Sequence, residues 1–90
     1  MNIEEIEKFL EKQKTGQGQQ VKINFRKRDT IYGLFVKGDD YTDLKSKNFW
    51  RIITLPNMPA WEKSKNIGLA KIFNGSEFSR LSIKDVSEAV

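Results

Sequence analysis

The amino-acid sequence predicts a mainly β protein, in which one N-terminal α-helix precedes five short strands that close into a small antiparallel barrel. Apolar residues recur at helical spacing only near the N-terminus, and from residue 21 onward they alternate with polar residues, as they do in strands. Turn-forming residues separate the short strands, which favours a closed barrel because closure removes exposed strand edges. Ninety residues suffice for a single domain, so we expect a helix over about residues 2–14, a barrel over about 20–83 and a frayed tail over 84–90.

The composition excludes several kinds of chemistry. The chain has no cysteine and no histidine, so it lacks disulfides, a reactive thiol, the usual general base and the commonest metal ligand. We therefore expect no enzyme activity, no cofactor and no metal site. Sixteen Lys and Arg residues against twelve Asp and Glu residues give a formal net charge of +4. This charge permits binding to nucleic acid or to an acidic partner without requiring it.

The N-terminal segment predicts the helix and bears on the location of the protein. Ile3, Ile6 and Leu10 form an apolar stripe at helical spacing, and Asn2 with Glu5 matches a capping box. We expect this stripe to cover one open end of the barrel. The segment is acidic, unlike a signal peptide, and no apolar run approaches the length of a membrane span. We therefore expect a cytoplasmic protein with no membrane partner.

The five strands follow from alternation and turn chemistry. The first strand alternates apolar residues with polar, mostly basic ones, and Gly33 inside the second strand is expected to let it bend around the core. An insertion at residues 56–64, longer than a hairpin needs, contains a short helical turn that starts at Pro59. The other predicted elements are strands at 21–26, 30–37, 49–54, 67–73 and 77–83, a polar turn at 38–43 and a tight turn at Asn74-Gly75.

Two stretches carry a family resemblance. Ile31, Gly33 and Phe35 at alternate positions lead to Asp40, and Phe73-Asn74-Gly75 is followed, after two variable residues, by Phe78. This pattern resembles the two halves of the motif of the Sm and Sm-like (LSm) family of small β-barrels. The resemblance implies an N-terminal α-helix followed by a five-stranded, strongly bent antiparallel SH3/Sm-like barrel. It also implies ring assembly through the edges of the last two strands and RNA bound by loops near the pore.

The same resemblance implies an RNA site. Asp40 matches the acidic residue that holds the base in this family, and Tyr41 beside it is a candidate for stacking on the base. Asp43 and Asn74 stand where the family has Asn and Arg, while Gly75 matches the family's glycine. The implied site therefore departs from the family's chemistry at two positions.

A basic cluster on the first strand and its turn is the second indication of nucleic-acid binding. Its members, Lys22, Arg26, Lys27 and Arg28, are candidates for phosphate contacts that add salt-dependent affinity. The alternative is a solvated face of the barrel. Exposed aromatic rings would add stacking to such a face. The candidates, which alternation or loop position places outside the predicted core, are Tyr32, Tyr41 and Trp61.

Two functions are consistent with these patterns. The first is a non-catalytic Sm-like module that binds RNA or another nucleic acid, with self-association into a ring or dimer as a further expectation. Its candidate site comprises Lys22, Arg26, Lys27, Arg28, Asp40, Tyr41, Asn74 and Gly75. The alternative is an SH3-like protein-interaction or structural adaptor domain that uses the insertion at residues 56–64, with Trp61 and Tyr32 as contact residues.

Overall fold

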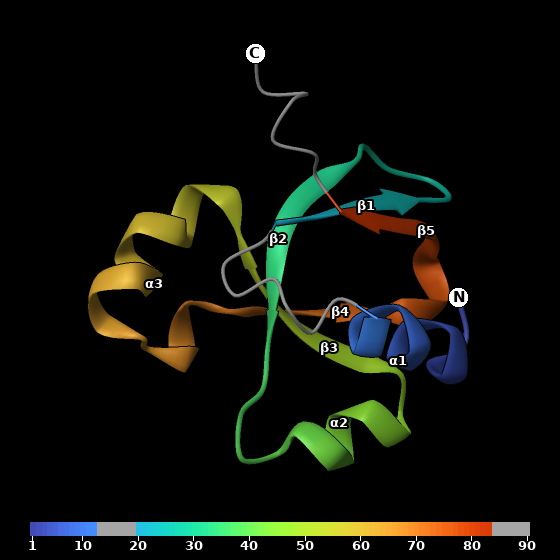
Figure 1. Cartoon of the computed structure of the whole chain (residues 1–90), viewed down its shortest axis with the longest axis horizontal. Coiled ribbons are helices and arrows are strands. Elements are labelled where there is room, and N and C mark those ends of the chain that lie inside the picture. Colours follow the sequence, from blue (N-terminus) through green and yellow to red (C-terminus); the bar gives the residue numbers. More distant parts are fainter. Residues whose placement is uncertain (13–19, 84–90) are drawn as a thin grey trace.

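The computed structural model describes residues 1–12 and 20–83 and shows a mainly β protein (Figure 1). Five strands form one antiparallel sheet in the order β4-β3-β2-β1-β5. The strands are β1 (Val21–Phe25), β2 (Ile31–Val36), β3 (Phe49–Thr54), β4 (Lys71–Asn74) and β5 (Phe78–Ile83). The helix α1 (Ile3–Lys12) precedes them. The prediction of an N-terminal helix followed by five antiparallel strands is therefore confirmed.

The sheet must bend strongly, because its two edge strands are consecutive in the sequence. β4 and β5 lie at opposite edges, and the 3₁₀ turn η3 (Gly75–Glu77) connects them directly. In a flat five-stranded sheet the two edges would be about 19 Å apart, whereas the chain from Asn74 to Phe78 spans at most about 14 Å. The sheet accordingly curls until β4 and β5 meet at the end beside η3 (Figure 1).

The described strands do not form the closed barrel that the sequence predicted. β4 pairs with β3 and β5 pairs with β1, but the two edge strands do not pair with each other. The Asn74-Gly75 step is therefore not the predicted hairpin turn. The Oδ1 atom of Asn74 accepts hydrogen bonds from the backbone N of Ser76 at 3.0 Å and from its Oγ at 2.8 Å. This capped turn directs β5 to β1 instead of back along β4.

Gly33 marks a close approach between β2 and β3. A Cβ atom at this position would lie 2.6 Å from Cγ2 of Ile52 and 2.8 Å from the carbonyl oxygen of Ile53. Such distances leave no room for a side chain. The glycine expected to let the second strand bend is thus also needed to let the neighbouring strand pack against it.

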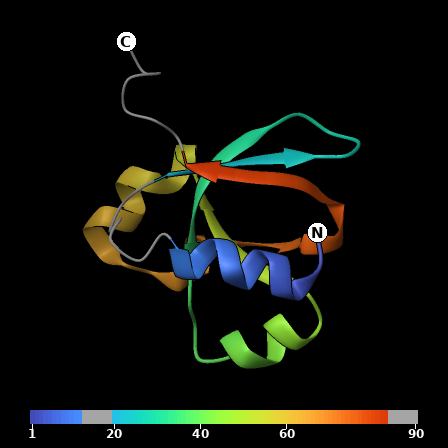
Figure 2. The ribbon, with the colours of Figure 1, turned by 45° about the vertical axis from the view of Figure 1, so that its right-hand side comes forward.

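The main core lies between α1 and the sheet. Ile6 of α1, Trp50 of β3 and Phe78 of β5 are almost completely buried in it. Figure 2 shows α1 between β5 and the short helix α2 (Tyr41–Ser46), where it covers the core. The predicted capping box is present, since the backbone N of Asn2 donates to Oε1 of Glu5 at 3.0 Å and the backbone N of Glu5 donates to Oδ1 of Asn2 at 2.8 Å.

A second, smaller core lies on the other face of β3. Ile52 belongs to the main core, whereas the next residue, Ile53, packs with Val36 and Met58. The helix α3 (Met58–Ser64) covers this cluster, and its Trp61 packs against it. The short helical turn predicted to start at Pro59 is thus confirmed, although it begins one residue earlier, and it buries the outer face of β3.

The structure differs from the predicted elements at two further places. Helix α2 occupies a segment predicted to be a polar turn, and it is too short for helical periodicity to reveal it. Its Lys45 pairs with Glu7 of α1 at 2.8 Å, so a contact distant in sequence stabilises it. The fourth strand begins at Lys71 instead of residue 67, because Asn66 caps the 3₁₀ turn η2 (Ile67–Leu69) through a 2.9 Å hydrogen bond from the backbone N of Gly68.

Some expectations fall outside the structure. The predicted helix end at residues 13–14 and the predicted frayed tail at 84–90 lie outside the described residues. Within the described ranges, no helix has the length and apolar character needed to cross a membrane.

Candidate nucleic-acid interface

The turn between β1 and β2 is held against the connection between β4 and β5. The backbone N of Arg26 donates to the carbonyl oxygen of Glu77 at 3.1 Å, which extends the pairing of β1 with β5. Within the turn region, Nδ2 of Asn24 donates to Oγ1 of Thr30 at 3.0 Å. These bonds position the exposed basic side chains of the turn. A pocket of about 420 Å³ lies here, lined by Phe25, Arg26, Lys27, Arg28, Ser76 and Glu77.

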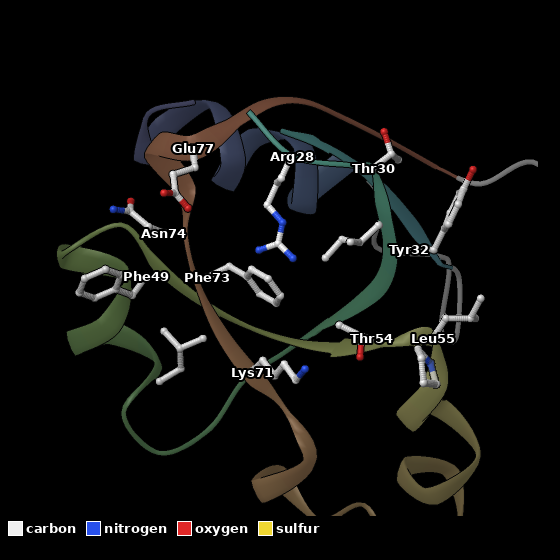
Figure 3. A pocket seen from close by; sticks show the side chains of 13 residues that line it. Arg28, Thr30, Tyr32, Phe49, Thr54, Leu55, Lys71, Phe73, Asn74 and Glu77 are labelled. Atoms are coloured by element: carbon white, nitrogen blue, oxygen red, sulfur yellow. The ribbon is translucent and has the colours of Figure 1, made fainter. Parts of the chain in front are cut away.

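A larger pocket, of about 750 Å³, adjoins Arg28 and Glu77 on the side of β4 (Figure 3). β4 forms one wall, and the start of β2 and the two ends of β3 form the others. Because β4 and β5 do not pair, none of the strands that the structure describes fills the space between β4 and the β1–β2 turn. The open edge of the sheet is therefore what creates this pocket.

Arg28 reaches from the β1–β2 turn into the centre of the larger pocket (Figure 3). Its guanidinium carbon lies 4.9 Å from the ring centroid of Phe25 and 5.7 Å from that of Phe73. Cation–π contacts of this kind contribute roughly 0.5–1 kcal/mol at exposed sites. In residues 1–12 and 20–83, no carboxylate forms an ion pair with Arg28. The aromatic rings thus position a guanidinium whose charge is not neutralised by an ion pair.

The walls of the two pockets combine cationic, aromatic and apolar side chains. Four cations line them, namely Arg26, Lys27, Arg28 and Lys71, against the single carboxylate of Glu77. Leu55 and Ile72 line the larger pocket and are 41% and 50% exposed, although both are large apolar residues. The combination suits a ligand with an anionic part and a planar or apolar part.

The predicted residues of the β4–β5 connection have structural roles. Asn74 lines the larger pocket while its side-chain oxygen caps η3. Gly75 is buried, and a Cβ atom there would lie 2.6 Å from Cδ1 of Ile6 and 2.7 Å from Nε1 of Trp50. Its backbone N donates to the carbonyl oxygen of Asn48 at 2.8 Å. Gly75 therefore supports the fold at this point and presents no surface to a ligand.

Asp40 lies at a different place and is engaged by Arg51. Nη2 of Arg51 donates to Oδ2 of Asp40 at 2.7 Å, and Nε donates to Oδ1 at 3.2 Å. The hydrogen bonds from Arg51 hold the pKa of Asp40 below its usual value. The two carboxylate oxygens that the resemblance predicts to bind a base thus accept hydrogen bonds from Arg51 instead.

Tyr41 is packed against the main core and lines neither pocket. Its ring meets that of Trp50 edge-on at 6.1 Å, and burial raises the pKa of its hydroxyl. The Nζ atoms of Lys37 and Lys45 lie 4.9 Å and 5.6 Å from the centroid of its ring. The structure therefore does not bring Tyr41 together with the basic β1–β2 turn.

The remaining predicted residues divide between the pocket and the second core. Lys22 lies directly opposite Tyr32 in the β1–β2 pairing, so the two share one face of the sheet, and Tyr32 lines the larger pocket. Trp61 packs on the second core, with Nζ of Lys65 5.3 Å from its ring centroid. Asp43 lies in the first turn of α2 and is exposed.

Several important residues were not predicted. Lys71, Phe73 and Glu77 enter the pockets because of the path of β4 and η3, which local patterns did not reveal. Asn48 has a left-handed backbone conformation, with φ of 64°. Its Nδ2 atom donates a hydrogen bond to the carbonyl oxygen of Met1 at 3.0 Å, and its Oδ1 atom accepts one from Nε1 of Trp50 at 2.7 Å. The sequence signal for this role was an Asn immediately before an apolar strand, because Asn tolerates the left-handed conformation better than most residues.

The structure tests the predicted site residues by which of them it brings together. In the part of the chain that the structure describes, no three Asp or Glu side chains gather as a metal site would require. The geometry instead assembles three of the four predicted basic residues, together with Tyr32 and Asn74, around two adjoining pockets. Comparisons with protein-family models, curated proteins and solved structures found no significant match to this chain.

Proposed function

We propose that this protein is a non-catalytic Sm-like module that binds single-stranded RNA or another single-stranded nucleic acid around Arg28. The binding surface, called the Arg28 surface below, comprises Arg26, Lys27, Arg28, Tyr32, Lys71 and Phe73. The observation that carries the proposal is the position of Arg28, which lies on two aromatic rings between two pockets and forms no ion pair with a described residue.

Single-stranded nucleic acid matches this surface in two respects. Its phosphates need cations that are not already neutralised, and the exposed side chains of Arg26, Lys27 and Arg28 supply them at one turn. Its unpaired bases need flat or apolar surfaces, which Tyr32 and Phe73 offer in the adjoining pocket. Duplexes present their bases inside the helix, so they would use the cations alone.

The Sm-like part of the proposal rests on topology. A helix precedes the strands, and consecutive strands β4 and β5 lie at opposite edges of one bent sheet. The glycines of both half-motifs, Gly33 and Gly75, occupy positions where a Cβ atom would collide with neighbouring atoms. The two unpaired edges are also compatible with assembly into a ring through β4 of one copy and β5 of the next, as the resemblance implies.

The protein-interaction alternative has less support. Trp61, its principal contact residue, is half-buried because it packs against the second core. The remaining candidate, Tyr32, lines the larger pocket. It is therefore already part of the proposed nucleic-acid surface.

Equilibrium binding of a fluorescent single-stranded RNA at increasing salt tests the proposal. If about three phosphates are neutralised, log K should fall against log salt with a slope near −2. Arg28→Ala should weaken binding about tenfold, because it removes both a cation and a stacking surface. Lys63→Ala on α3 is the matched control, since it removes one exposed cation that lines neither pocket. Absence of binding at low salt, or equal losses in the two variants, would contradict the proposal.

A further inference from the structure

We infer that the larger pocket receives one unstacked base and selects guanine. This inference rests on the proposed function, because it names the base that the Arg28 surface binds. It starts from a carboxylate in an unexpected place. Glu77 lines both pockets, although the other charged residues of the two linings are four cations that favour phosphate.

The carboxylate of Glu77 is available to a ligand. Its side chain is exposed, and in the described ranges no lysine or arginine forms an ion pair with it. A surface that bound phosphates alone would gain nothing from this charge, since the carboxylate repels them. Its position at the boundary of the two pockets is instead consistent with contact to the edge of a base whose phosphate lies beside Arg26 and Lys27.

The larger pocket is large enough to admit a base, and its walls offer that base a stacking surface. Its volume of about 750 Å³ falls within the range of small-ligand sites. Phe25 and Phe73 hold the planar guanidinium of Arg28 in this space, which gives a base a cationic plane on which to stack. Figure 3 shows Glu77 and Asn74 together on one side of the pocket, with Tyr32 and Leu55 on the opposite side. A stacked base would therefore have the polar groups of Glu77 and Asn74 at one of its edges.

Guanine is the base whose edge matches a carboxylate. Its N1–H and N2–H groups are adjacent donors, so both carboxylate oxygens can accept hydrogen bonds at once. Adenine and cytosine each place a ring-nitrogen acceptor beside their amino group, and uracil flanks its N3–H with two carbonyl oxygens. Each of these acceptors would face the negative charge of Glu77. Lys71 in the same pocket can in turn donate to O6 or N7 of guanine, while Arg28 provides the plane on which the base stacks.

The test compares single-stranded uridine oligonucleotides of about ten nucleotides that differ in one central base. The central base is guanine, hypoxanthine (as inosine), adenine or uracil, and the affinities are measured by fluorescence anisotropy. Guanine should bind about tenfold more tightly than the others, which is the size of effect expected for a bidentate contact. Hypoxanthine is the sharpest comparison, because it differs from guanine by the absent 2-amino group alone.

Glu77→Gln should abolish the preference for guanine over hypoxanthine without weakening the binding of the uridine-only oligonucleotide. Glu62→Gln on α3 is the matched control, since it makes the same charge change on an exposed helix outside both pocket linings and should keep the preference. Equal affinities for all four oligonucleotides in the unmodified protein would overturn the inference and leave the proposed function standing. Binding of none of them would overturn both.

Discussion

Two regions of this small protein use the same kinds of residue in opposite ways. Around α2, the charged and aromatic side chains satisfy one another: Asp40 pairs with Arg51, Lys45 pairs with Glu7, and Tyr41 packs against the core. At the Arg28 surface, cations and rings also meet, but no described carboxylate forms an ion pair with the cations there. Residue type alone therefore does not distinguish a structural cluster from a candidate binding surface. What distinguishes them is whether the partners of each charge lie within the chain.

The two regions are joined through Gly75 and Asn48, and the largest expected effect lies there. Gly75→Ala should lower the free energy of unfolding by about 3 kcal/mol, because its Cβ would collide with Ile6 and Trp50 in the core. Urea denaturation measures the change. Gly38→Ala near α2 is the control and should cost much less, since the nearest atom to its Cβ is the flexible side chain of Asp40 at 3.2 Å. Equal losses would show that the junction is not tightly packed.

Asn48→Ala should have the next largest effect, at about 2 kcal/mol. It removes the acceptor of the buried Trp50 N–H and places Ala in a left-handed conformation. Asn48→Gly separates the two causes, because glycine tolerates the conformation but restores no hydrogen bond. We expect the Gly variant to be more stable than the Ala variant by about 1 kcal/mol in the same denaturation experiment. A Gly variant no more stable than the Ala variant would argue against backbone strain.

Removing one arginine from each region compares their contributions to RNA affinity. Arg28→Ala should lower the affinity for single-stranded RNA about tenfold and stability by less than about 1 kcal/mol. Arg51→Ala removes a cation of the other region and should leave RNA affinity unchanged, because Arg51 lines neither pocket. An Arg51 variant that lost affinity as much as the Arg28 variant would remove the distinction between the regions.

The smallest expected effect concerns the pH dependence of the α2 region. The pKa of Asp40 is lowered in the folded state by hydrogen bonds from Arg51, and its ordinary value is 3.8. The contribution of this pair to stability is therefore present above pH 3.8 and is lost as the pH falls through the lower, folded-state pKa. Asp40→Asn should be slightly less stable at neutral pH, and the difference should shrink in acid. A difference that grows in acid would contradict this assignment.

The elements that could be predicted are those whose signals are local. Strict alternation identified β1, aromatic and β-branched residues identified β3, and Asn2 with Glu5 identified the start of α1. Helix α2 was missed because six residues are too few for a period to emerge, and its pairing with α1 joins positions far apart in the sequence.

The candidate site was predictable to the same limited extent. The basic run Arg26–Arg28 was visible in the sequence, and it does line the pockets. Phe73 and Glu77 line the larger pocket because β4 and β5 do not pair with each other. The local sequence around either residue does not determine this lack of pairing. Tyr41 was assigned to the surface because the turn around it was expected to be open, whereas α2 folds it onto Trp50.

The central claim is that nucleic acid binds at the Arg28 surface and not at the α2 region. The most direct measurement is a titration of ¹⁵N-labelled protein with a short single-stranded RNA, followed through backbone amide shifts in NMR spectra. We predict that the largest shifts fall within residues 25–32 and 71–77, while those of α2 (Tyr41–Ser46) and of Asp40 change little. Shifts centred on Asp40 and α2, or no shifts at low salt, would contradict the claim.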